Sequence, residues 1–322
     1  MSGVEPASLA TAVRAAAERI RAHVVATPLV GASWLSRELG ADVRLKLENV
    51  QTTGSFKLRG AVNALLQLPP ERRARGVVAA SSGNHGLAVA TAAKSLQVPA
   101  TVFVPTTTPA EKQAAIAAAG ASVQVHGDDC VVTEQHAREV AQASHRPYLS
   151  PYNDAAVVAG QGTVAVELLQ QWPEVETIYV ALGGGGLIAG MAAYAKACRS
   201  GIAVVACSPS ASPAMAECVR QGAIQDVPCG PTWSDSTAGG VEPGAITFPL
   251  CRTLVDRFVD VDEDTIARGM RDCLAHQHLL VEGAVGVAIA AARQDRERRG
   301  RNVAVVVCGG NLPMALLRRL LA

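Results

Sequence analysis

Lys57 is the residue whose place in the sequence most strongly suggests chemistry. It follows an alternating apolar segment, residues 43–47, and a polar turn that contains Gly54, and a helix is predicted over residues 56–68. The positive end of a helix dipole disfavours an ammonium group and so lowers the pKa of a lysine there. An amine that is neutral part of the time can act as a nucleophile or form a Schiff base. The alternative is that Lys57 is an ordinary solvated surface lysine, and only motifs elsewhere in the sequence can distinguish the two interpretations.

Two loops further along the chain lie between a predicted strand and a predicted helix, where backbone N–H groups bind anions. Residues 81–86 read SSGNHG, and their N–H groups and hydroxyls suit a carboxylate, with an ordinary capped turn as the alternative. Residues 183–186 are four glycines, which allow the backbone to wrap a phosphate. No Gly-Lys-Ser/Thr follows, so this run is not a P-loop.

Residues 308–311, with the sequence CGGN, follow the last predicted strand. The Cys308 side chain would reach a heterocycle bound at the carboxyl edge of a parallel sheet, unless it is simply a buried structural thiol. One ligand requires a Schiff-base lysine, a phosphate cup, a carboxylate loop and a partner for a ring nitrogen together. That ligand is pyridoxal 5′-phosphate carrying an amino acid.

Composition excludes several classes of protein. The 322 residues are 49% hydrophobic and 18% charged, as in a globular protein with a substantial core. The net charge of +1 and the 3% of aromatic residues argue against nucleic-acid binding. The eight cysteines contain no Cys-x-x-Cys pair, so zinc spacing is absent. With no secretory signal and no membrane span, we expect reduced thiols and a cytoplasmic location.

The elements that must position these residues alternate between strand and helix, which predicts an α/β fold of doubly wound parallel sheets. They form two blocks: a small domain of residues 54–148 and a large domain of residues 1–53 and 149–322. We expect the site where the blocks meet, at the carboxyl ends of the strands. Strands are predicted at residues 76–80, 100–104, 122–125, 177–182, 203–207 and 303–307, and helices at residues 7–24, 86–96, 110–119, 130–143, 160–171, 186–199, 262–276 and 282–293.

The motifs Ser-Phe-Lys at 55–57, SSGNHG, tetraglycine and CGGN, in this order, resemble those of the fold-type II pyridoxal-phosphate enzymes, which share the tryptophan synthase β fold. Within that class the chain is similar to the serine/threonine dehydratase and serine racemase group, from Thr27 to Asn311. The resemblance implies a Schiff base on Lys57, which also moves the substrate's α-proton. The other implied roles are Phe56 against the ring, Asn84 on the ring hydroxyl, Cys308 at the pyridine nitrogen, Gly183, Gly184, Gly185 and Gly186 on the phosphate, and Ser81, Ser82, Gly83 and His85 around the substrate carboxylate.

The resemblance further implies an ammonia-lyase that forms a homodimer and converts a β-hydroxy amino acid to a 2-oxo acid and ammonia. Small residues of the loop 235–244, including Thr237 and Gly239, would leave room for a substrate as bulky as phenylserine, beside serine and threonine. Ser208 and Ala214 replace acids of the family's cation site, so no metal is expected. A neutral thiol at Cys308 makes the ring a weak electron sink, which suits β-elimination.

Three alternatives stay open at this point. Ser82 stands where racemases carry their second acid, so an amino-acid racemase is one of them, and a β-replacement synthase on the same fold is another. The third is an NAD(P)-dependent dehydrogenase, because Gly184, Gly186 and Gly190 resemble a relaxed dinucleotide fingerprint. The next predicted strand, however, ends at Cys207 without an acid to hold a ribose hydroxyl.

Overall fold

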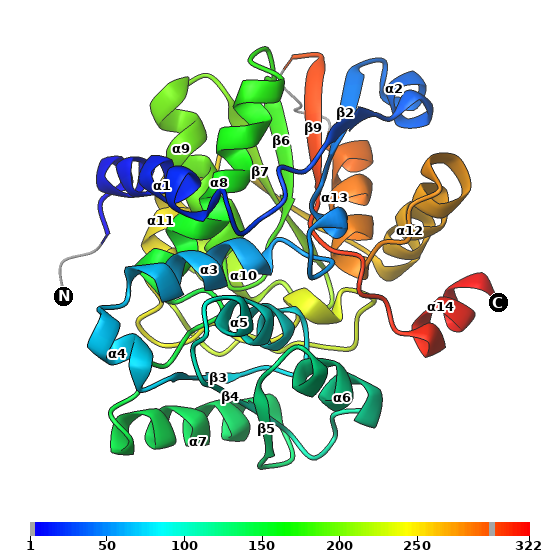
Figure 1. The fold of residues 1–322 in the computed structure, drawn as a ribbon. Helices are drawn as coiled ribbons and strands as arrows, with labels where there is room; N and C mark the ends of the chain where they lie inside the picture. Colours follow the sequence, from blue (N-terminus) through cyan, green and yellow to red (C-terminus); the bar gives the residue numbers. More distant parts are fainter. Residues whose placement is uncertain (1–3, 296–299) are drawn as a thin grey trace.

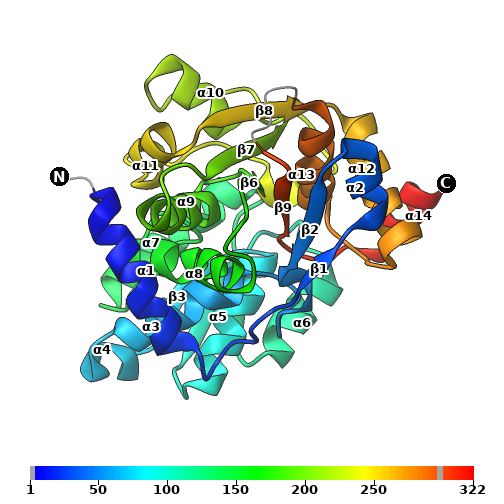
Figure 2. The same ribbon diagram turned by 90° about the horizontal axis from the view of Figure 1, so that it is seen from above.

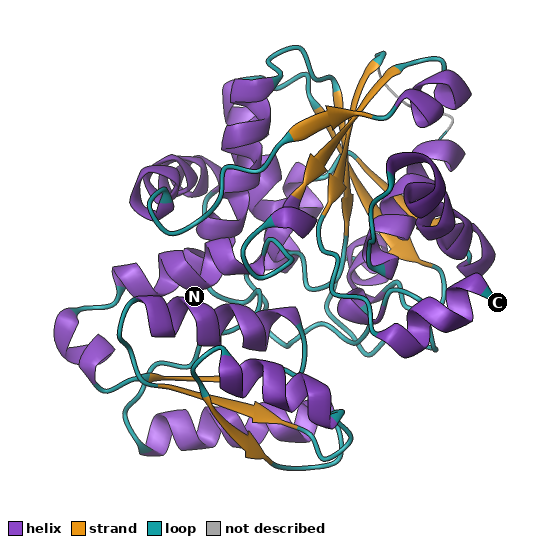
Figure 3. Cartoon of the chain, turned by 45° about the vertical axis from the view of Figure 1, so that its right-hand side comes forward, coloured by secondary structure: helices purple, strands orange, loops and turns teal. Residues whose placement is uncertain are grey.

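The structure is a computed structural model that describes residues 4–295 and 300–322. Within this part of the chain the strands form two separate sheets, each with helices on both faces (Figure 3). The alternation of strands and helices therefore produces the α/β fold that the sequence predicts. None of the described helices has the length and apolar character needed to cross a bilayer.

The larger sheet has the strand order β1-β2-β9-β6-β7-β8 in the described residues. The neighbouring strands are parallel, as predicted, except for the additional edge strand β1, which runs antiparallel to β2. Only the short helix α2 (Ser33–Leu39) joins β1 to β2, which is too little chain for a parallel crossover. The strands are β1 (Leu29–Gly31), β2 (Asp42–Leu47), β6 (Thr177–Ala181), β7 (Ala203–Pro209), β8 (Arg257–Val261) and β9 (Asn302–Val307).

Helices cover both faces of this sheet, which explains why its inner strands are continuous apolar runs (Figure 2). Strand β6 is buried throughout, and β9 is buried from Val303 onward. Helices α1 (Pro6–Ile20), α8 (Ala155–Gln171), α9 (Gly186–Cys198) and α11 (Thr247–Leu254) lie on one side; α2, α12 (Glu263–Gln277) and α13 (Gly283–Gln294) lie on the other. The short α10 (Ala214–Gln221) packs against α11, and α14 (Met314–Leu321) packs against α12.

The smaller sheet consists of β3 (Val77–Ala80), β4 (Ala100–Val104) and β5 (Ser122–Val125), all parallel. In Figure 1, α5 lies on the side of this sheet that faces the larger sheet, and α7 lies on the far side. Helix α3 packs on α5 and on α8, so it lies between the two sheets. The helices of this part are α3 (Lys57–Gln67), α4 (Pro70–Ala74), α5 (Asn84–Ser95), α6 (Ala110–Ala118) and α7 (Cys130–Ala143).

Glycines bring α3 and α8 unusually close together. A Cβ atom on Gly160 would lie 2.6 Å from the carbonyl oxygen of Arg59 and 2.7 Å from the Cα of Gly60. Helix α8 also begins earlier than predicted, because Asp154 caps it: its Oδ1 accepts the backbone N–H groups of Ala156 and Val157 at 2.7 and 2.9 Å. These contacts hold the first turns of α3 against the larger sheet's helices.

Candidate active site

Lys57 is the first residue of α3 and lies beside the carboxyl end of β9. The preceding residue, Phe56, donates its backbone N–H to the carbonyl oxygen of Cys308 at 3.1 Å, and Ser55 forms a bridge with Gly309. The Lys57 Nζ donates to the carbonyl oxygen of Pro151 at 3.0 Å and lies 5.2 Å from the centre of the Phe56 ring. Segments distant in sequence therefore meet at this amine, as predicted.

The surroundings of Lys57 lower the pKa of its amine to about 8. Burial is the largest cause, and the nearby Cys308 and Glu282 oppose it in part. The expected direction is confirmed, but its largest cause is removal of water from the amine and not the helix dipole on which the sequence argument relied. About a tenth of this amine is consequently neutral, and so nucleophilic, at pH 7, and about half at pH 8.

This pKa predicts a specific pH dependence for the reaction of the cofactor-free protein with an aldehyde. The rate should rise about tenfold per pH unit below pH 8 and level off above it, because only the neutral amine attacks. Stopped-flow absorbance with pyridoxal 5′-phosphate measures this rate, and a lysine peptide, with its pKa of about 10.4, is the reference. A protein rate that keeps rising to pH 10 would contradict the lowered pKa.

The four glycines form the turn between β6 and α9, and their surroundings leave no room for side chains. A Cβ atom on Gly184 would overlap the ring of Tyr152, and one on Gly183 would lie 3.0 Å from the Cα of Thr237. Gly185 has a φ of 86°, in the left-handed region that favours glycine. A loop without side chains at the start of a helix presents its N–H groups to an anion, so it fits a phosphate.

Replacing Gly184 with alanine should weaken phosphate binding, because the new methyl group displaces either Tyr152 or the loop itself. We expect the dissociation constant for pyridoxal 5′-phosphate to rise about 10- to 100-fold, which corresponds to about 1.4–2.8 kcal/mol. Fluorescence titration of the cofactor-free variant measures this constant. Gly201→Ala is the matched control, since a Cβ atom there meets open space. Equal affinities of the two variants for pyridoxal 5′-phosphate would contradict the role of residues 183–186 as a phosphate-binding loop.

The SSGNHG loop connects β3 to α5, which begins at Asn84. Ser81 and Ser82 are partly exposed and Gly83 is exposed, so their polar groups are accessible at the loop. His85 is buried, and its Nε2 lies 2.8 Å from the carbonyl oxygen of Leu149. Burial, together with the positive charge of Lys57, lowers the pKa of His85 to about 3. Its ring is therefore a neutral group fixed to the backbone.

Glu282 and Asn311 fix the orientation of Asn84, and the sequence argument missed both roles. Asn84 Nδ2 donates to the two carboxylate oxygens of Glu282 at 2.8 and 3.0 Å, and its Oδ1 accepts from Asn311 Nδ2 at 2.7 Å. Asn311 also donates its backbone N–H to Glu282 Oε1 at 2.9 Å. Burial raises the pKa of Glu282. The available signal was a single acid between apolar residues 279–281 and 284–285, typical of a buried carboxylate.

Cys308 directly follows the strand β9 and is buried within the same group of residues. Burial, with the negative charge of Glu282 next in size, raises the pKa of its thiol well above the ordinary value. The thiol is therefore neutral and can hydrogen-bond a heterocyclic nitrogen, but it cannot hold a proton on that nitrogen as a carboxylate would.

The predicted loop 235–244 belongs to a largely irregular segment, residues 224–244, that contains the short 3-10 helix η2 (Asp235–Thr237). Thr237 lies against Gly183, as a site residue should, whereas the backbone N–H of Gly239 bonds to Ser212 Oγ at 3.3 Å. Tyr152 accepts the backbone N–H of Glu242 at 2.9 Å. The Glu242 carboxylate reaches the smaller sheet's helix α7, where it pairs with Arg138 at 2.8 Å.

The fold and the site together define an enzyme class that binds a phosphorylated aldehyde cofactor. A buried amine with a lowered pKa, a loop that fits a phosphate and a fixed amide lie together between the two sheets. The chain belongs to the pyridoxal-phosphate dependent enzyme family, whose model matches residues 20–309.

Individual relatives agree with this assignment over nearly the whole chain. The L-threonine ammonia-lyase of Thermotoga maritima is 36% identical over 95% of this chain and 76% of its own. The L-threo-3-hydroxyaspartate ammonia-lyase of Saccharomyces cerevisiae is 35% identical over 93% of this chain and 92% of its own. Among solved structures, maize serine racemase is similar with a TM-score of 0.91 and 32% identity, covering 97% of this chain and 96% of its own.

Proposed function

We propose that this protein is a pyridoxal-phosphate dependent ammonia-lyase that converts a β-hydroxy-α-amino acid to a 2-oxo acid and ammonia. The observation that carries the proposal is the Lys57 amine, with its pKa of about 8, beside a loop that fits a phosphate. Overall, the β-hydroxyl leaves as water and a water oxygen then replaces the amino group, which leaves as ammonia. Pyridoxal phosphate, when bound, withdraws electrons from the substrate's α-carbon.

The roles proposed for the chain's own residues follow from their positions. The neutral Lys57 amine removes the α-proton. Residues 183–186 hold the phosphate, Phe56 lies against the ring, and Asn84, oriented by Glu282 and Asn311, bonds the ring hydroxyl. The loop residues Ser81, Ser82, Gly83 and His85 surround the substrate carboxylate, which the hydroxyls and backbone N–H groups of the loop bind. Thr237 and Gly239 lie beside the β-substituent.

The neutral Cys308 thiol favours elimination over other reactions of the same family. Because it does not keep the ring nitrogen protonated, it limits how strongly charge is drawn from the α-carbon. The β-hydroxyl, which takes up a proton and leaves as water, then accepts the electrons of the broken C–O bond. Racemisation is the second candidate. It is supported by the similarity to maize serine racemase and by Ser82, which would return a proton to the opposite face of the substrate.

The test is a panel of substrates given to protein reconstituted with the cofactor. L-serine, L-threonine, L-threo-phenylserine and L-threo-3-hydroxyaspartate are incubated separately, and ammonia, 2-oxo acid and the enantiomer ratio are measured. We expect ammonia and oxo acid in equal amounts from at least one neutral substrate. Racemised amino acid without ammonia would instead establish the second candidate, and a strict preference for serine would end the idea of room for a phenyl group.

We further propose a homodimer in the cytoplasm, with domain boundaries at residues 53/54 and 148/149. The division into two sheets supports the boundaries. All eight cysteines lie in the described residues and are free thiols, which supports a reducing compartment. Light scattering after size exclusion tests the dimer, and limited proteolysis tests the boundaries.

A further inference from the structure

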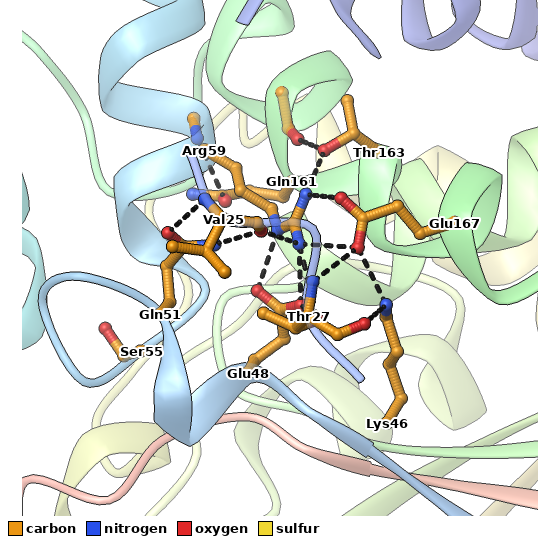
Figure 4. A network of polar contacts seen from close by, with 12 residues as sticks. Val25, Thr27, Lys46, Glu48, Gln51, Ser55, Arg59, Gln161, Thr163 and Glu167 are labelled. Carbon is orange, nitrogen blue, oxygen red and sulfur yellow. Dashed lines mark hydrogen bonds and ion pairs between the residues drawn. The ribbon is translucent and has the colours of Figure 1, made fainter. Parts of the chain in front are cut away.

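Four charged side chains form a buried cluster behind the Lys57 segment. They are Lys46 of β2, Glu48 of the short helix η1 (Glu48–Val50), Arg59 of α3 and Glu167 of α8, and we call them the charge cluster (Figure 4). Lys46, Glu48 and Arg59 are completely buried. Two cations and two carboxylates balance, so the cluster is neutral as a whole.

Arg59 is the centre of the charge cluster. Its Nε and Nη2 bind the two oxygens of Glu48 at 2.7 and 2.8 Å, and its Nη1 and Nη2 bind the two oxygens of Glu167 at 2.6 and 3.0 Å. Nη1 also donates to Thr163 Oγ1 at 3.3 Å. A planar guanidinium held by two carboxylates in this way has one orientation, which a lysine in its place would not reproduce.

Lys57 and Arg59 leave the same helical turn in opposite directions. Successive residues of an α-helix are rotated by about 100°, so these two side chains are about 200° apart around the axis of α3. The Lys57 amine reaches Pro151 in the site, whereas Arg59 reaches Glu48 and Glu167 behind it. Any rotation of the turn that loosens Arg59 must therefore also move the Lys57 amine.

The segments joined by the charge cluster are those that carry the site. Glu48 follows β2, the neighbour of β9, and Cys308 directly follows β9. Glu167 lies on α8, the helix that begins after Pro151 and Tyr152. The backbone N–H of Gly60 donates to Gln161 Oε1 at 3.1 Å, so α8 holds the same turn at a second point.

Stability alone is a weak reason for such a cluster. Burying four charges requires removing water from each, and apolar side chains of similar volume often stabilise a protein as well or better. A network in which every partner is fixed does, however, specify one geometry. That geometry is the orientation of the first turn of α3.

We infer that Arg59 is a positioning residue, which acts through the charge cluster to fix the rotation of the first turn of α3 and thereby the place of the Lys57 amine. The expected effect of Arg59 on turnover rests on the proposed function, whereas its effect on the position of the Lys57 amine does not. Displacing a reacting group by about 1 Å can lower a rate 10²-fold. The effect should therefore be on turnover and on the reactivity of Lys57 and only slightly on substrate affinity.

The test compares Arg59→Lys with Arg257→Lys. Arg257 of β8, at the far edge of the larger sheet, likewise pairs with a carboxylate: its Nη2 and Nε both donate to Asp295 Oδ2, at 2.7 and 3.2 Å. Melting temperature, kcat, KM and the pH dependence of Lys57 acylation in the cofactor-free protein are measured for both variants. For Arg59→Lys we expect kcat to fall at least about 10-fold, KM to change less than about threefold and the midpoint of Lys57 acylation to move. Arg257→Lys should lower only the melting temperature.

Two outcomes would overturn the inference. One is a lower melting temperature for Arg59→Lys with unchanged kcat and Lys57 acylation, which would make Arg59 structural only. If Arg59→Lys does not fold, the double variant Lys46→Met, Glu167→Gln is used in its place, because it keeps the charge cluster neutral. The second outcome that would overturn the inference is unchanged Lys57 acylation in this double variant. Acylation needs no cofactor, so it tests Arg59 even if the wild type proves to have no ammonia-lyase activity.

Discussion

Lys57→Ala is expected to lower kcat/KM at least about 10⁴-fold, because it removes both the amine that holds the cofactor and the base that moves the α-proton. The visible absorbance of the reconstituted protein should disappear with it. Steady-state ammonia release and the absorbance spectrum measure the two losses separately. They should coincide, because one nitrogen atom serves both purposes.

The control for this variant is Lys94→Ala, which removes an exposed lysine of α5 and should leave both readouts unchanged. Adding methylamine to Lys57→Ala supplies a free amine and should restore part of the turnover, since the rest of the site is intact. A variant that keeps the visible band, or that turns over at the wild-type rate, would refute the role of this amine.

Glu282→Ala is expected to have the second largest effect, although Glu282 itself need not touch the substrate. Its carboxylate accepts from Asn84 Nδ2 and from the backbone of Asn311, so its loss leaves two donors without their partner. A lost partner for a buried group corresponds to about 1–3 kcal/mol. We expect kcat/KM and cofactor affinity to fall about 10- to 100-fold, with Glu282→Gln intermediate because it keeps one acceptor oxygen.

Glu176→Ala offers a matched comparison for Glu282→Ala. The carboxylate of Glu176 likewise accepts two backbone N–H groups, from Arg301 and Asn302, but at the amino end of β9. It should lower stability without changing cofactor affinity, measured by fluorescence titration. If the two variants bind the cofactor equally well, Glu282 does not orient Asn84.

The parts of the site that the sequence predicted are those that follow strands directly. Asn84, residues 183–186 and Cys308 each come just after an apolar run, and the carboxyl ends of parallel strands meet at one edge of a sheet. The helix of Lys57 was predicted for the same reason. The local sequence pattern was sufficient for these residues, because a residue that directly follows a strand of a parallel sheet lies at the sheet's carboxyl edge, where the site is.

The parts that the sequence did not predict depend on contacts between distant segments. Glu282 acquires its role from Asn84, which lies 198 residues away. Arg59 looks like a solvated helix residue until Glu48 and Glu167 surround it. Strand β8 and helix α11 were missed because Arg257 and Asp260 interrupt the apolar run of β8, and because Pro249 inside α11 is typical of a loop.

The order of strands in the larger sheet has a consequence for synthesis on the ribosome. Asp42 of β2 pairs with Asn302 of β9, so β2 lacks its parallel neighbour until almost the entire chain has been translated. Strands β3, β4 and β5, by contrast, follow one another in sequence and pair among themselves. We therefore expect the smaller sheet to form first in the nascent chain, while the apolar side chains of β2 await β9 and need shielding by a chaperone.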